Sequence, residues 1–150
     1  MSRAVSSGLM AILLATAMSG PALAQAPPAR PAVTAPNYTF DSTVALLLFY
    51  VRPDKVADFE AVVGRLAQAL DASTDPARRQ QAAAWRMLRS SEPPRDAVVY
   101  VFLLDPVVPN ADYDPVRILS ESLPTEVQPL YDKLKASVIR VERMALTKLR

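Results

Sequence analysis

Val44-Ala-Leu-Leu-Leu-Phe-Tyr-Val51 is the stretch that decides the fold. It is a continuous apolar run of strand length, and Arg52-Pro53-Asp54 ends it. A strand without polar alternation is typical of a sheet that is covered on both faces. The run therefore predicts a buried β-strand whose sheet needs a cover on each side.

The segment that follows, Lys55 to Leu70, has the pattern of an amphipathic helix. Its large apolar residues recur at helical spacing and are Val56, Phe59, Val63, Leu66 and Leu70. Charged residues occupy the other faces, as expected for a helix that buries one stripe. We expect Phe59 to dock inward onto the sheet.

Further along, the chain shows more strand and helix signals. We expect strands at 83–89, 97–104 and 141–147 and helices at 116–122 and 125–136. The turn-rich segment 90–96 joins the first two of these strands as a hairpin. Asp114 before Pro115 predicts a helix N-cap. The alanines of 81–90 also favour a helix that could begin within 77–81, so the strand expected at 83–89 has a helical alternative.

The order strand, helix, strand, strand, broken helix, strand predicts an α+β fold. It is the βαββαβ pattern of a ferredoxin-like sandwich with an antiparallel sheet, and its helices cover one sheet face. The first strand nevertheless carries apolar side chains on both faces: Leu46, Leu48 and Tyr50 opposite Leu47, Phe49 and Val51. We take Leu48 and Leu103 as residues of the two different faces. Because the chain has no helix left for the second face, we expect a homodimer with its sheets face to face.

The first 37 residues carry the signals of an exported protein. A basic start at Arg3, an apolar run from Gly8 to Met18 and the small residues before Gln25 predict a signal peptide at 1–24, cleaved after Ala24. The run is too short to span a bilayer, so we expect no stable membrane insertion after cleavage. Residues 25–37 are rich in proline and alanine and predict a spacer before a domain at 38–150. We expect a periplasmic or secreted location.

Composition excludes several classes of chemistry. The chain has no cysteine and no histidine, which rules out disulfides, Ser-His-Asp and Cys-His catalysis, histidine-ligated haem and ordinary zinc sites. Removing residues 1–24 removes one charge, Arg3, and lowers the formal net charge from +2 to +1. That balance gives no basic excess for nucleic-acid binding. We assign no catalytic residue, no metal site and no cofactor.

Three stretches resemble one known superfamily. The opening YVRPDKVADFEAVV (50–63), then WRMLRS (85–90) and AVVYVFLLDP (97–106), are similar to the dimeric α/β-barrel superfamily. That group includes antibiotic-biosynthesis monooxygenases, NIPSNAP-like proteins and stress-responsive barrel proteins, and the resemblance covers Val44 to Leu149. It implies a ferredoxin-like fold that dimerises. Because this fold hosts many activities and the iron-binding histidine of its haem-active members is absent, no catalytic residue is carried over.

Aromatic and basic residues of the expected strands are the candidates for ligand binding. They are Tyr50, Arg52, Trp85, Arg86 and Tyr100. A guanidinium beside aromatic rings can hold a carboxylate or a planar anion. The alternative is that the aromatic residues fill the core or a dimer interface, and that the arginines lie in water.

Three functions are compatible with this pattern. The first is an exported dimeric barrel that binds a small-molecule ligand or a partner without catalysis. The second is a cofactor-independent, monooxygenase-like enzyme for a small aromatic substrate, in which Trp85 and Tyr50 hold the substrate and Arg86 or Arg52 stabilises negative charge. The third is a structural interaction subunit. A roomy cleft between helices and sheet favours a ligand or a substrate, whereas a filled one favours the structural role.

Overall fold

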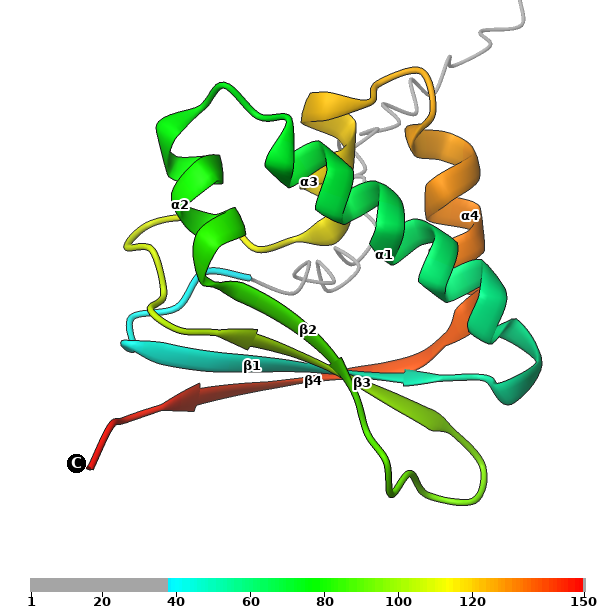
Figure 1. Cartoon of the computed structure of the whole chain (residues 1–150). Coiled ribbons are helices and arrows are strands. Elements are labelled where there is room, and N and C mark those ends of the chain that lie inside the picture. The colour runs from blue at the N-terminus through cyan, green and yellow to red at the C-terminus, as the bar shows by residue number, and fades with distance from the viewer. Residues whose placement is uncertain (1–37, 150) are drawn as a thin grey trace, which may run out of the picture. The chain divides into compact units, whose positions relative to one another are not determined.

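The computed structural model describes residues 38–149, which form one antiparallel sheet and its helices (Figure 1). The expected signal peptide and spacer lie outside the described residues. The elements are β1 (Val44–Val51), the 3-10 turn η1 (Pro53–Lys55), α1 (Val56–Asp71), α2 (Pro76–Ala84), β2 (Trp85–Arg89), β3 (Val98–Leu104), α3 (Pro115–Ser122), α4 (Val127–Ser137) and β4 (Val138–Leu146). The predicted mixed α+β class is therefore confirmed.

The four strands form an open sheet in the order β2-β3-β1-β4, and all neighbours are antiparallel. The apolar run of β1 lies in the interior of this sheet, between β3 and β4, which explains why it lacks polar residues. Phe49 of β1 pairs with Tyr100 of β3 and with Val141 of β4. The hairpin expected between β2 and β3 is present, with Trp85 opposite Leu104.

All four helices lie on one side of the sheet (Figure 1). The layer between them and the sheet is the core, in which Phe59 of α1 is fully buried, as expected, against Phe49, Tyr100 and Phe102. Leu66 and Leu70 of the same helix are buried too. Within residues 38–149, no helix is long and apolar enough to cross a membrane.

Alternating burial along β1 separates the two faces of the sheet. Ala45, Leu47, Phe49 and Val51 are buried under the helices, and the residues between them are half-buried. Leu46, Leu48 and Tyr50 therefore occupy the face away from the helices, which strand parity alone could not assign. Our assignment of Leu48 and Leu103 to different faces is wrong, because Leu103 pairs with Leu46 and shares that face.

Two strands begin at least two residues away from their predicted starts. The strand expected to begin at Ala83 begins at Trp85, because helix α2 continues through Ala84. Alanine has the highest helix propensity, and the strand starts at the first large aromatic residue. Strand β4 begins at Val138 rather than Val141, directly after α4. The predicted N-cap is confirmed, since the Asp114 carboxylate accepts a hydrogen bond of 2.9 Å from the Val116 amide.

Candidate functional site

The sheet face away from the helices, which we call the open face, is the first candidate. It is formed by alternate residues of the four strands: Leu46, Leu48 and Tyr50 of β1, Arg86 and Leu88 of β2, Val99, Val101 and Leu103 of β3, and Arg140, Glu142 and Met144 of β4. None of the described helices covers it (Figure 1). The face is apolar in its middle and carries charges on its two outer strands.

The apolar part of the open face reaches from one edge of the sheet to the other. Leu88 on β2 is 50% exposed and Met144 on β4 is 45% exposed. Between them, Leu48, Val101 and Leu103 are only half-buried although they lie on interior strands. Large contiguous apolar surfaces are uncommon on monomeric proteins, and this face is therefore a candidate interaction site.

A polar cluster occupies one end of the open face. The Arg140 guanidinium lies 3.5 Å from the centre of the Tyr50 ring, which is a close cation–π contact. The Glu142 carboxylate accepts hydrogen bonds from Tyr50 Oη (3.2 Å) and from Arg140 Nε (2.9 Å). Tyr50, a predicted ligand residue, is therefore engaged by two neighbours of its own chain.

The two arginines among the candidate ligand residues lie apart from Tyr50. Arg86 projects from the open face on edge strand β2, and Tyr50 is on β1 with β3 between them. Arg52 follows the end of β1 as the residue before η1, and its amide donates to the Ser137 carbonyl at 2.9 Å. Arg52 and Tyr50 are thus not two residues of one strand face, because the strand ends at Val51.

Trp85 lies on the opposite face of the sheet, in the core. Its ring meets Phe102 and Tyr113 edge-on, with centroids 5.6 and 5.4 Å away. Its Nε1 is inaccessible to solvent and has no hydrogen-bond partner among the described residues. A shallow hollow of about 270 Å³ beside it is lined by Met87, Leu70 and Trp85 among others. Because Nε1 is buried, an occupant of that hollow meets only the apolar part of the indole.

Tyr100 also faces the helices and ties the sheet to α1. Its hydroxyl donates to Glu60 Oε1 at 2.5 Å, and Arg89 pairs with the same oxygen at 3.5 Å. Burial, together with the neighbouring Glu60 carboxylate, raises the pKa of Tyr100 to about 12. The phenol therefore stays protonated at neutral pH and does not serve as a base. Its geometry indicates a structural contact between β3 and α1.

The layer between helices and sheet is filled by side chains. Phe49, Phe59 and Phe102 form a ring cluster at its centre, with centroids 4.7 to 6.4 Å apart. Tyr113 and Leu47 are fully buried in the same cluster of core residues. The centre of the layer between helices and sheet is therefore occupied by the protein's own core.

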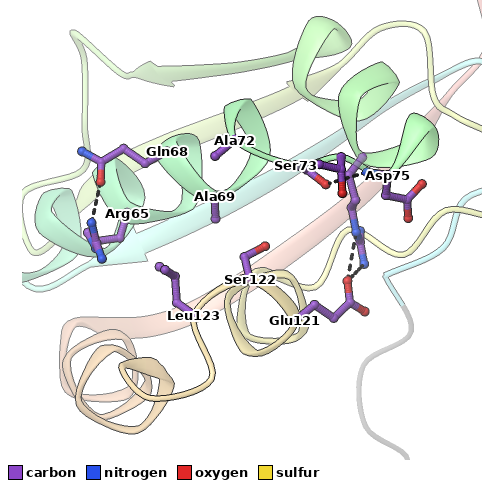
Figure 2. Close-up of a pocket in the computed structure, with 11 residues that line it drawn as sticks. Arg65, Gln68, Ala69, Ala72, Ser73, Asp75, Glu121, Ser122 and Leu123 are labelled. Atoms are coloured by element: carbon purple, nitrogen blue, oxygen red, sulfur yellow. Dashed lines mark hydrogen bonds and ion pairs between the residues drawn. The ribbon is translucent and has the colours of Figure 1, made fainter.

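A hollow of about 510 Å³ lies elsewhere, between α1, the start of α2 and the end of α3 (Figure 2). Arg65 on its rim donates to Gln68 (2.7 Å) and to both carboxylate oxygens of Glu126 (2.6 Å each). Arg78 pairs with Glu121 at 2.7 Å. Both guanidinium groups are neutralised by carboxylates, so the hollow presents no excess positive charge to an anion.

The Arg78 side chain also donates hydrogen bonds to two groups other than Glu121. It donates to Gln81 Oε1 (2.7 Å) and to the Asp112 carbonyl (2.6 Å), and the buried Gln81 donates to the same carbonyl at 3.0 Å. This network joins α2 to the loop before α3. The network gives the buried Gln81 amide and the Asp112 carbonyl hydrogen-bond partners, and so it fixes the loop against α2.

Comparison of the chain with known protein families, with curated protein sequences and with solved structures gave no match. Within residues 38–149, no group of three acidic side chains is placed to hold a metal ion. The structure thus divides the five predicted ligand residues between two faces and one strand end. The residues that the structure does bring together, from all four strands, are those of the open face.

Sequence reasoning missed two residues of this face, Arg140 and Glu142. Their alternation with Val141 is a strand signal, but the strand was expected to begin at Val141, which left Arg140 outside it. Their contact with Tyr50 depends on the pairing of β4 with β1, which are about 90 residues apart in the sequence. A start of β4 at Val138 would have placed both on one face with Met144.

Proposed function

We propose that this is an exported, partner-binding protein that forms a homodimer through its open face. The observation that carries the proposal is the burial pattern of β1, which leaves Leu46 and Leu48 on a face without a described cover. A second copy supplies an equal apolar sheet face. Two such faces pack with their strands nearly aligned and about 10 Å apart.

We further propose that each copy is a ferredoxin-like sandwich and that the pair forms a dimeric α/β barrel. The strand order β2-β3-β1-β4 and the crossover from β1 through α1 to β2 support this assignment. Helices α3 and α4 take the place of the second helix of the βαββαβ pattern, and α2 is an addition before β2.

The hydrophobic effect supplies the driving force for the pairing. Burying apolar surface contributes roughly 25 cal/mol for each Å² removed from water. The side chains of Leu48, Val101 and Leu103 at the centre are apolar, so burying them leaves no side-chain polar atom without a partner. The charged residues lie on the outer strands, where an interface tolerates water.

The filled core favours an interaction function over a ligand-binding or enzymatic one. The monooxygenase-like alternative needs a cleft beside Trp85 that holds an aromatic substrate. Phe102 and Tyr113 pack edge-on against the indole, and the hollow of about 270 Å³ beside it is smaller than the roughly 300–1,000 Å³ of typical ligand pockets. Of the candidate residues that remain accessible, Arg86 and Tyr50 lie on the open face and belong to the proposed interface, whereas Arg52 is exposed beyond the end of β1.

Export is the second part of the proposal. The basic start, the apolar run and the small residues before Gln25 support a signal peptide that is removed after Ala24. The expected location is the periplasm or the medium.

Native mass spectrometry of the protein recovered from an exporting host tests both parts. We expect a dimer without added mass, built from chains that begin at Gln25. A dimer that carries an extra small mass would replace the interaction function by ligand binding. A monomer would contradict the proposed pairing, and chains that retain residues 1–24 would contradict the cleavage.

A further inference from the structure

The charges of the open face lie on its two edge strands. Their positions depend on the sheet register and distinguish between possible orientations of two paired copies. Arg86 on β2 has no hydrogen bond or ion pair within residues 38–149. Glu142 lies on β4, the opposite edge of the same sheet. The two strands between them, β3 and β1, place Val101 and Leu48 at the middle of the face.

The register of the sheet fixes the relative positions of these charges. Arg86 pairs with Leu103, Leu103 pairs with Leu46, and Leu46 pairs with Met144. Glu142 is the neighbour of Met144 on the same face, two residues away. One such step along a strand is about 7 Å. Arg86 and Glu142 therefore lie on opposite edges of the sheet, offset by one such step along the strands.

Two sheets that pack face to face are related by a two-fold axis that lies between them. An axis parallel to the strands places β2 of one copy over β4 of the other, and β3 over β1. An axis across the strands places β2 over β2 and β4 over β4. Since a two-fold interface uses the same residues twice, each choice makes a different pair of charged contacts.

The two axes differ in the charges that they bring together. An axis across the strands sets the β2 strands of both copies against each other, and the open face of β2 consists of Arg86 and Leu88, so Arg86 meets no carboxylate there. The open face of the adjacent β3 consists of Val99, Val101 and Leu103 and offers Arg86 no carboxylate either. Burying a charged side chain in an interface without an opposite charge is costly.

We infer that the two-fold axis runs along the strands, so that Arg86 of each copy pairs with Glu142 of the other. This inference rests on the pairing proposed above and adds the charged contact that sets its geometry. Sheets about 10 Å apart and crossing at about 30° bring these two edges within reach of an arginine side chain. A carboxylate accepts up to about four hydrogen bonds, so Glu142 can receive Arg86 while it holds Tyr50 and Arg140.

Charge reversal tests the inference. The dissociation constant of the dimer is measured by sedimentation equilibrium in low-salt buffer for Arg86→Glu, for Glu142→Arg and for the variant that carries both. We expect each single substitution to raise the constant about tenfold or more, because it sets two like charges against each other at two places. We expect the double substitution to bring the constant back to within about threefold of the original.

The control is Arg79→Glu, which reverses an exposed charge on α2, away from the open face, and should leave the constant unchanged. If both single variants dimerise as well as the unaltered protein, or if the double variant is no better than the single ones, the axis along the strands is wrong. Either result, obtained while the unaltered protein is a dimer, contradicts this inference and leaves the proposed pairing intact. If the unaltered protein is itself a monomer, the proposed pairing fails and this inference fails with it.

Discussion

Leu48→Lys is expected to convert the dimer into a folded monomer. Leu48 lies on the interior strand β1, at the middle of the open face, where it is half-buried in the single copy. In the proposed dimer it lies between two sheets, and an unpaired lysine there is costly to desolvate. The substitution occurs twice per dimer, so we expect the dissociation constant to rise by about three orders of magnitude. Size-exclusion chromatography with light scattering measures the mass, and circular dichroism verifies that the variant is folded.

The matched control is Leu149→Lys, the same change at a leucine that is 93% exposed near the C-terminus. It is expected to leave the dimer intact. Leu103→Lys, on the same face as Leu48, should behave as Leu48→Lys does. If both open-face variants are folded dimers, the proposed interface is elsewhere.

Phe59→Ala is expected to lower the free energy of unfolding by about 3–5 kcal/mol. The Phe59 ring is 0% exposed and lies between helix α1 and the sheet, 4.7 Å from the centre of the Tyr100 ring and 5.6 Å from that of Phe49. Truncation removes the transfer free energy of the ring and leaves a cavity that close-packed neighbours fill only in part. Urea denaturation at one fixed protein concentration measures the change, because the stability of a dimer depends on concentration.

Tyr131→Ala removes an aromatic ring that is 39% exposed on α4 and serves as the control. It is expected to cost less than about 1 kcal/mol. Should Phe59→Ala fail to fold, Phe59→Leu keeps the test open with an expected loss of about 1–2 kcal/mol. A loss at Phe59 no larger than that at Tyr131 would show that α1 does not dock through this ring.

Hydrophobic periodicity was enough to predict most elements of the fold. The apolar run of β1, the helical spacing around Phe59 and the proline after Asp114 each gave the right kind of element. The boundary between α2 and β2 was harder to predict from the sequence. Ala83 and Ala84 are compatible with the end of a helix and with the start of a strand, and tertiary packing selects between the two. Parity within a strand identified the two sets of β1 residues correctly. It could not relate Leu103 to Leu48, because that relation depends on the register between β1 and β3.

The candidate site was less predictable for the same reason. Residue type alone grouped Tyr50 with Trp85 as aromatic residues of strands. The structure places Trp85 under the helices and Tyr50 on the open face, where Arg140 covers its ring. Contacts between strands that are distant in the sequence decide which of these side chains meet, and a single sequence gives no direct record of them.

The most direct test of the central claim measures whether the open face is covered in solution. Hydroxyl-radical footprinting followed by mass spectrometry reports the oxidation of Met144 on the open face and of Tyr131 on α4, which are exposed to similar extents in the single copy. We expect Met144 to be protected at high protein concentration and to become reactive on dilution, while the oxidation of Tyr131 stays constant. Oxidation of Met144 that does not depend on concentration, in a protein that is dimeric at the higher one, would contradict pairing through this face.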